Sequence, residues 1–286
     1  TRELEFKSKE VSIVNDELSI ANEHIIKQIE ELKHKNSLLE NSFNYAQSIQ
    51  NALLPDTFEF IKNKKSIFVL NKPKDIISGD IYLMEQINEV LYVAVVDCSG
   101  QGMQGAILSI LVQNKLLSII NSVPNILPCE ILSSFQKEFH ELFKNKDVSH
   151  IDNETIHIGI LSINENNKTL YYSGMQMPIY IVRKNELIQL KGETESITIS
   201  NYIDTFKQEN FTIEQNDTIY ITTNGYANQF NSKSERFKRT NLKALLLDIN
   251  KMSMMEQKKE LERQHEDWKG STPQTDDILV LGIKLE

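Results

Sequence analysis

Apolar residues recur every seven positions along the first 53 residues of the chain. The series is Leu4, Val11, Leu18, Ile25, Leu32, Leu39, Ala46 and Leu53. A seven-residue repeat kept over more than three or four cycles is typical of a coiled coil. Because no Gly or Pro occurs before Pro55, the pattern predicts one helix of about 50 residues, on the order of 75 Å long, that ends at this proline.

The second apolar position of each seven-residue repeat is less regular. It holds Val14 and Ala21, then moves by one to Ile29 and Phe43, and includes the polar Asn36. The helix either folds back onto its own domain or pairs in parallel with a second copy of the chain. We favour a homodimer through residues 4–53, because a sustained heptad needs a partner helix and a helix this long is not stable alone.

Beyond residue 54 the pattern changes to short β-rich runs separated by turns. The predicted strands are 67–70, 81–87, 91–97, 156–163, 170–173, 179–183, 186–190, 211–213, 218–222 and 278–284. The predicted helices are 105–122, 129–144, 242–249 and 253–269. Strands and helices that occur in blocks, with tight turns between neighbouring strands, indicate a layered α+β domain with antiparallel pairing over residues 55–286.

The composition is that of a soluble globular protein, with 40% hydrophobic and 25% charged residues. A formal net charge of -9 argues against general affinity for nucleic acid or an anionic membrane. Two cysteines are too few for a disulfide framework, so we expect a reducing compartment, the cytoplasm. No run reaches the roughly 18 apolar residues of a membrane span. The chain begins at Thr1 inside the predicted helix, so we expect an upstream sensor or membrane segment in a longer protein.

Four polar residues stand at the ends of predicted strands, two of them directly beside glycine. They are Asp80, Asp97, Asn224 and Asp276. Each taken singly is ordinary turn chemistry. Hard oxygen ligands brought from several strand ends to one place are, however, how Mg²⁺ or Mn²⁺ is held, and an adjacent glycine lets a carbonyl or phosphate approach closely.

The same segments follow one another in a familiar order. They are residues 46–55 (AQSIQNALLP), 72–80 (KPKDIISGD), 96–102 (VDCSGQG), 173–178 (SGMQMP), 223–225 (TNG) and 274–277 (QTDD). Together they resemble the SpoIIE-type branch of the metal-dependent (PPM) serine/threonine protein phosphatases. The resemblance implies a sandwich of two antiparallel β-sheets flanked by helices, acting on phosphoserine or phosphothreonine of a bacterial regulatory protein through a pair of Mg²⁺ or Mn²⁺ ions.

Roles for individual residues follow from this resemblance alone. Asp97 would bridge both metals and Cys98 would offer its backbone carbonyl. Asp80 would support the second metal, while Asp276 and the residue at 224 would hold the first. Asp277 is the weaker candidate of the adjacent acidic pair. The resemblance also assigns a catalytic position to Gln101, beside Asp97, and phosphate or substrate contacts to three glycines, namely Gly79, Gly100 and Gly102.

Four positions depart from the family pattern. Asn224 stands where the family has Asp, and Gln101 where His is usual. His157 replaces an Asp, and Asn228 replaces a second acidic residue. We expect His157 to be a core histidine rather than a new ligand, because imidazole suits Zn²⁺ better than Mg²⁺. Since hard cations depend on carboxylates, these changes favour impaired or absent catalysis.

Three functions therefore remain open. The first is a pseudophosphatase that binds a phosphoprotein or another regulatory partner under control of the helix. The second is an active Mg²⁺- or Mn²⁺-dependent phosphatase in signal transduction. The third is a dimerising scaffold with a passive domain.

Overall fold

The computed structural model describes residues 2–53, 66–100, 102–144 and 154–285. The chain divides into two compact units, Thr1–Ala46 and Gln47–Glu286. The first is helical throughout its described part, and the second holds all of the sheet structure described here.

Helix α1 spans Arg2–Leu53, so the predicted long helix is confirmed. In the single chain, the repeat residues from Leu4 to Leu39 are solvent-exposed, as Leu18 (58% exposed) and Leu32 (59%) illustrate. Exposing apolar surface to water costs about 25 cal/mol per Å². The exposed repeat residues therefore give the helix a face suited to burial against a partner. The predicted stop at Pro55 lies outside the described residues.

Two antiparallel sheets form the centre of the second unit. One sheet has the order β1-β11-β10-β6-β7, and the other has the order β2-β3-β4-β5-β9, with β8 paired to β4. The first sheet comprises β1 (Ile67–Lys72), β11 (Ile278–Lys284), β10 (Thr218–Thr222), β6 (Ile179–Arg183) and β7 (Glu186–Leu190). The second comprises β2 (Asp80–Ile87), β3 (Val90–Cys98), β4 (Thr155–Asn164), β5 (Thr169–Met175), β9 (Glu209–Thr212) and β8 (Ile197–Thr198).

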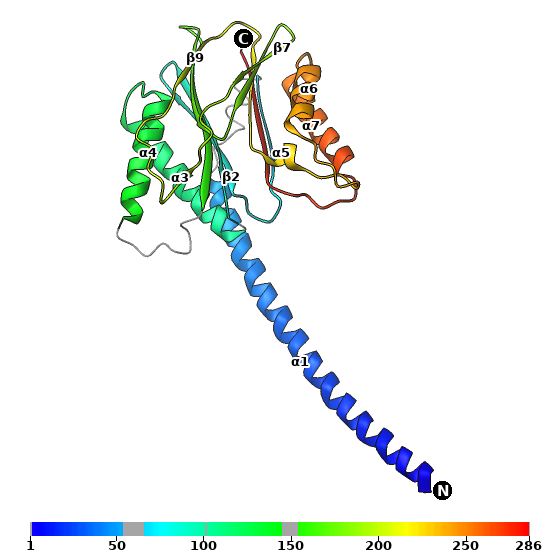
Figure 1. Cartoon of the computed structure of the whole chain (residues 1–286). Coiled ribbons are helices and arrows are strands. Elements are labelled where there is room, and N and C mark those ends of the chain that lie inside the picture. The colour runs from blue at the N-terminus through cyan, green and yellow to red at the C-terminus, as the bar shows by residue number, and fades with distance from the viewer. Residues whose placement is uncertain (1, 54–65, 101, 145–153, 286) are drawn as a thin grey trace. The chain divides into compact units, whose positions relative to one another are not determined.

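Helices cover the outer faces of both sheets (Figure 1). The second sheet is covered by α3 (Met103–Ser122) and α4 (Pro128–Phe143). The first sheet is covered by α6 (Arg239–Ile249) and α7 (Met254–Lys269), next to the short α5 (Gly225–Asn228). The predicted two-sheet sandwich flanked by helices is therefore confirmed.

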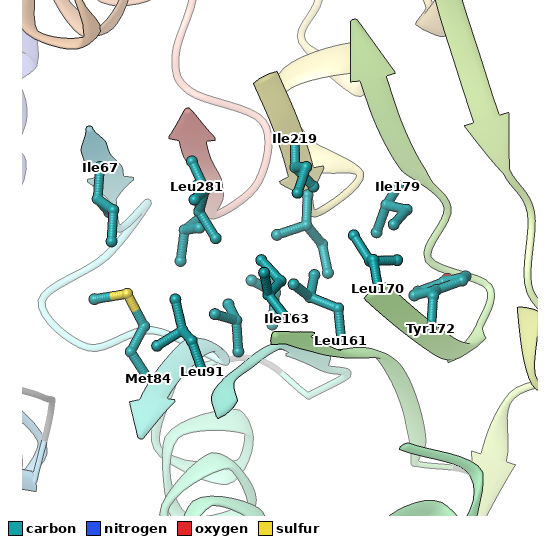
Figure 2. Packing of buried hydrophobic residues seen from close by; sticks show 14 of the residues in the cluster. Ile67, Met84, Leu91, Leu161, Ile163, Leu170, Tyr172, Ile179, Ile219 and Leu281 are labelled. Atoms are coloured by element: carbon teal, nitrogen blue, oxygen red, sulfur yellow. The ribbon is translucent and has the colours of Figure 1, made fainter. Parts of the chain in front are cut away.

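Alternation along the strands separates the core into layers. In β3, Val93 and Val95 point into the space between the sheets, whereas Ala94 and Val96 face α3 and α4. Figure 2 shows the inter-sheet layer, where Leu161 and Ile163 from one sheet meet residues of the other. Both faces of β3 are buried, so a shift of one residue in its register would exchange the two layers.

The predicted strands and helices occur within a few residues of their expected bounds. The β6–β7 hairpin turns at Lys184 and Asn185, whose φ angles of 49° and 68° belong to the tight turn that suits a twisted hairpin. Two short elements were missed, β8 and α5. A two-residue strand and a four-residue helix are too short to produce a periodic pattern.

In the part of the chain that the structure describes, one helix, α3, is long and apolar enough to cross a membrane by length and composition. Its residues Val112, Leu116 and Ile120 are fully buried in the core beneath α4. Packing inside the domain accounts for this apolar face.

Candidate metal centre

Strand register brings ionisable residues together at one end of the second sheet. Asp80 lies directly opposite Asp97 in the β2–β3 pair, and Asp97 lies opposite His157 in the β3–β4 pair. Directly opposed residues of antiparallel strands share a face and approach to about 5 Å, and like charges in such a pair are destabilising. The two carboxylates therefore need a nearby cation or hydrogen-bond donors.

The first sheet supplies donors at this place. Thr223, which follows β10, donates from Oγ1 to Asp80 Oδ2 at 2.7 Å. The next residue, Asn224, donates from Nδ2 to Asp97 Oδ2 at 2.9 Å. These two hydrogen bonds join the end of one sheet to the end of the other.

The Asp80 carboxyl is buried, with 4% of the residue exposed. Burial, followed by the negative charge of Asp97, raises its pKa well above the ordinary 3.8, while the Thr223 hydroxyl partly opposes the rise. The carboxyl of Asp276 reaches solvent, yet loss of hydration and then repulsion from Asp97 raise its pKa too. Asp80, Asp97 and Asp276 thus form one electrostatically crowded group.

Asp277 has a different environment from its neighbour. Its Oδ1 accepts the Lys74 backbone N–H at 2.7 Å and its Oδ2 accepts that of Gly79 at 2.8 Å. Both carboxylate oxygens therefore fasten the loop that leads into Asp80. This carboxylate orders backbone rather than facing the other acids.

Two glycines allow the backbone segments of the site to touch. A Cβ at Gly79 would lie 2.4 Å from the carbonyl oxygen of Cys98, and one at Gly225 would lie 1.8 Å from that of Asp277. Real Cβ atoms do not approach this closely, so any side chain would push the site apart.

The chain matches a family model described as Stage II sporulation protein E (SpoIIE) over residues 88–286. The chain belongs to the SpoIIE family.

Solved structures agree on the SpoIIE-family fold. The SiaA-PP2C domain of Pseudomonas aeruginosa is 23% identical, with a TM-score of 0.79 over 88% of this chain and 98% of that chain. The PP2C phosphatase domain of SpoIIE from Bacillus subtilis is 15% identical (TM-score 0.63, 77% and 63% covered). RsbX in complex with magnesium is 17% identical (TM-score 0.54, 77% and 94% covered). No curated protein matches the sequence.

The structure brings together most positions that the SpoIIE resemblance singles out. Asp80 and Asp97 are opposite each other where the sheets end, and Asn224 is hydrogen-bonded to Asp97. Asp276 lies near enough to Asp97 for their charges to repel. Gly100 and Gly102 lie between β3 and α3, and Gln101 lies outside the described residues. The Cys98 side chain is buried, and burial followed by the charge of Asp97 raises its thiol pKa well above 9.0, so it is no nucleophile.

His157 corrects one expectation. It is not a core histidine, because its side chain is 26% exposed and its Nδ1 lies 3.4 Å from Asp97 Oδ2. The prediction failed because the residues on both sides of His157 in the sequence are apolar. Only the register with β3 reveals that Asp97 is its neighbour.

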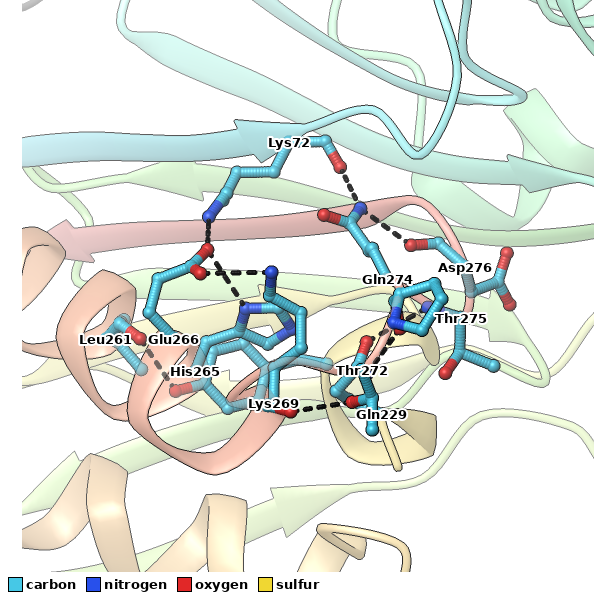
Figure 3. A network of polar contacts seen from close by, with 12 residues as sticks. Lys72, Gln229, Leu261, His265, Glu266, Lys269, Thr272, Gln274, Thr275 and Asp276 are labelled. Atoms are coloured by element: carbon cyan, nitrogen blue, oxygen red, sulfur yellow. Dashed lines mark hydrogen bonds and ion pairs between the residues drawn. The ribbon is translucent and has the colours of Figure 1, made fainter. Parts of the chain in front are cut away.

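Sequence reasoning missed a set of neutral residues that hold the loop before β11 (Figure 3). Gln274 donates from Nε2 to the carbonyl oxygens of Lys72 and Asp276, each at 2.8 Å. The buried Gln229 accepts the Thr275 N–H at 3.0 Å. Lys72 also pairs with Glu266 of α7. The segment before β11 is thereby held from β1 and from the residue that follows α5.

The described residues do not fit a two-metal centre as they stand. No three His, Cys, Asp or Glu side chains among the described residues are grouped so as to hold one ion. The Asn224 amide presents N–H, not oxygen, to Asp97, and its Oδ1 accepts from Asn228 Nδ2 at 2.8 Å. The carboxylates carry suitable charge, but the ligand expected from β10 is turned away.

Replacing Asp80 by Asn tests the crowding of carboxylates. Asn keeps an oxygen for the Thr223 hydroxyl and removes a buried charge, so Asp80→Asn should raise the free energy of unfolding at pH 7 by on the order of 1 kcal/mol or more. Because the folded-state pKa of Asp80 is raised, this gain is full above that pKa and vanishes as pH falls below about 3.8. Urea unfolding without metal from pH 4 to 8 measures it. The exposed Asp75→Asn is the control, and equal effects of the two changes would refute the crowding.

Asp277 and Asp276 make a matched pair for a second test. Asp277→Ala leaves two backbone N–H groups without their acceptor and should lower the free energy of unfolding by about 1–3 kcal/mol. Asp276→Ala removes a carboxylate that is repelled by Asp97 but that also accepts the Asp277 backbone N–H at 2.9 Å, so it should lower the free energy of unfolding by less than Asp277→Ala does. Urea unfolding compares both, and equal losses would show that Asp277 does not fasten the loop.

Proposed function

We propose that this protein is a SpoIIE-family signalling protein that acts by binding a phosphoprotein or other regulatory partner, with phosphatase catalysis impaired or absent. One observation carries the proposal. At the position where a carboxylate ligand is expected, Asn224 uses both ends of its amide within the protein, toward Asp97 and Asn228. Divalent cations of the Mg²⁺ class bind through oxygen and depend on carboxylate charge for affinity, and this site offers neither at that point.

An active Mg²⁺- or Mn²⁺-dependent phosphatase is the second candidate. It is favoured by the crowding of Asp80, Asp97 and Asp276, whose mutual repulsion a cation would relieve. RsbX, a structural neighbour, was solved with magnesium. On this reading the substrate is phosphoserine or phosphothreonine of a bacterial regulatory protein, and the present amide orientation belongs to a resting state.

We assign residues 1–54 to a coiled-coil signalling helix and residues 55–286 to the SpoIIE-like phosphatase domain. The exposed repeat of α1 supports a parallel homodimer through residues 4–53 that links the domain to an upstream sensor. We assign the protein to the cytoplasm, because the two cysteines, Cys98 and Cys129, are unpaired, as expected in a reducing compartment.

Hydrolysis of p-nitrophenyl phosphate with Mn²⁺ tests the choice between these functions. The unmodified chain should turn over at least about tenfold more slowly than Asn224→Asp, which restores the fourth carboxylate. Asp97→Ala serves as the background control. If the unmodified chain is as active as Asn224→Asp and Asp97→Ala abolishes that activity, the proposal is wrong.

The dimer is tested by sedimentation at several concentrations. The unmodified chain should form dimers, and Ile25→Asp should shift it toward monomer because it buries a charge in the seam. Ser19→Asp adds the same charge on a position one residue past Leu18, away from the repeat, and should leave the dimer intact. A strict monomer at every concentration would exclude the coiled-coil dimer.

A further inference from the structure

Asn228 lies one helical turn beyond Asn224, at the other end of α5. The Asn228 backbone N–H donates to the Asn224 carbonyl oxygen at 3.0 Å, which fixes the spacing of the two residues. Their side chains are also bonded, from Asn228 Nδ2 to Asn224 Oδ1 at 2.8 Å. Asn224 Nδ2 then donates to Asp97 Oδ2 at 2.9 Å. A directed chain of hydrogen bonds runs from Asn228 through Asn224 to the Asp97 carboxylate.

We infer that Asn228 is a positioning residue that holds the Asn224 amide with its N–H toward Asp97 and thereby closes this position to a divalent cation. The inference rests on the proposed function and names the residue responsible for the closed site. The loss of one carboxylate at 224 is then only part of the cause.

The direction of this series of hydrogen bonds follows from counting donors and acceptors. A carboxamide has one oxygen acceptor and one NH₂ donor, and an ionised carboxylate only accepts. Without a cation, turning Asn224 over would set its oxygen against an oxygen of Asp97, which repels it. Asp97 therefore selects the described orientation of Asn224, and the oxygen of Asn224 in turn selects the NH₂ end of Asn228.

Metal binding would require both amides to turn. For Asn224 to ligate a cation, its Oδ1 must face Asp97, which points its NH₂ at the NH₂ of Asn228. Two donors cannot bond, so Asn228 would have to rotate as well. The backbone of α5 keeps the two side chains within reach of each other, so this cost is built into the local sequence Asn224-Gly225-Tyr226-Ala227-Asn228.

An acidic residue at 228 would reverse the direction of the hydrogen bonds between residues 228 and 224. A carboxylate there accepts the Asn224 N–H and leaves Asn224 Oδ1 free to face the cation beside Asp97. Partners that orient a ligand typically change metal affinity by 10–100-fold. Asn228→Asp should therefore raise affinity for Mn²⁺ although residue 228 itself does not contact the Asp97 carboxylate.

The experiment is a Mn²⁺ titration of the full chain, followed by calorimetry, for the unmodified protein, Asn228→Asp, Asn228→Ala and Asn224→Asp. Asn228→Asp should bind about tenfold more tightly than the unmodified chain. Asn228→Ala adds no charge but removes the opposing NH₂, so it should gain about threefold, which attraction to an added charge cannot explain. Thermal unfolding of each variant verifies that it is folded.

Two outcomes separate the inference from the proposed function. If Asn224→Asp gains affinity while both Asn228 variants bind like the unmodified chain, the positioning role of Asn228 is refuted and the proposed function stands. If the unmodified chain already binds Mn²⁺ as tightly as Asn224→Asp, the proposed function is refuted. The inference that Asn228 closes this position to a cation is then refuted as well.

Discussion

The pairing of Asp80 with Asp97 at the end of β2 and β3 is the constraint on which the rest of the site depends. The register cannot slip, because both faces of β3 are buried and a shift would turn each layer of side chains to the wrong side. Two carboxylates are thus forced together. A cation is one way to balance them, and hydrogen-bond donors are another. This chain uses the Thr223 hydroxyl and the Asn224 amide.

Those donors act only because the segments that carry them are held in place. Gly225 lets α5 press on the backbone of Asp277, and Asp277 in turn fastens the loop before Asp80. Gln229 and Gln274 fix the same segment by neutral hydrogen bonds. The site is therefore one connected hydrogen-bonded structure across both sheets, which suits a stable binding surface even without metal.

Much of this was visible in the sequence. Heptads predicted α1, alternating apolar residues predicted the strands, and acidic residues at strand ends pointed to Asp80, Asp97 and Asp276. Orientation was not visible, because the way an amide such as Asn224 points depends on partners from other strands. The roles of Gln229 and Gln274 were missed because neutral side chains that bond to backbone leave no motif. His157 was expected in the core because the sequence alone does not give the β3–β4 register that places it beside Asp97.

What occupies the space between Asp97 and Asn224 decides whether this site is closed to metal. A crystal structure of the full chain grown in millimolar Mn²⁺, with anomalous scattering recorded at the manganese edge, examines that space directly. We expect no manganese there and Asn224 Nδ2 within hydrogen-bonding distance of Asp97. A manganese ion bonded directly to Asn224 Oδ1 would contradict this expectation.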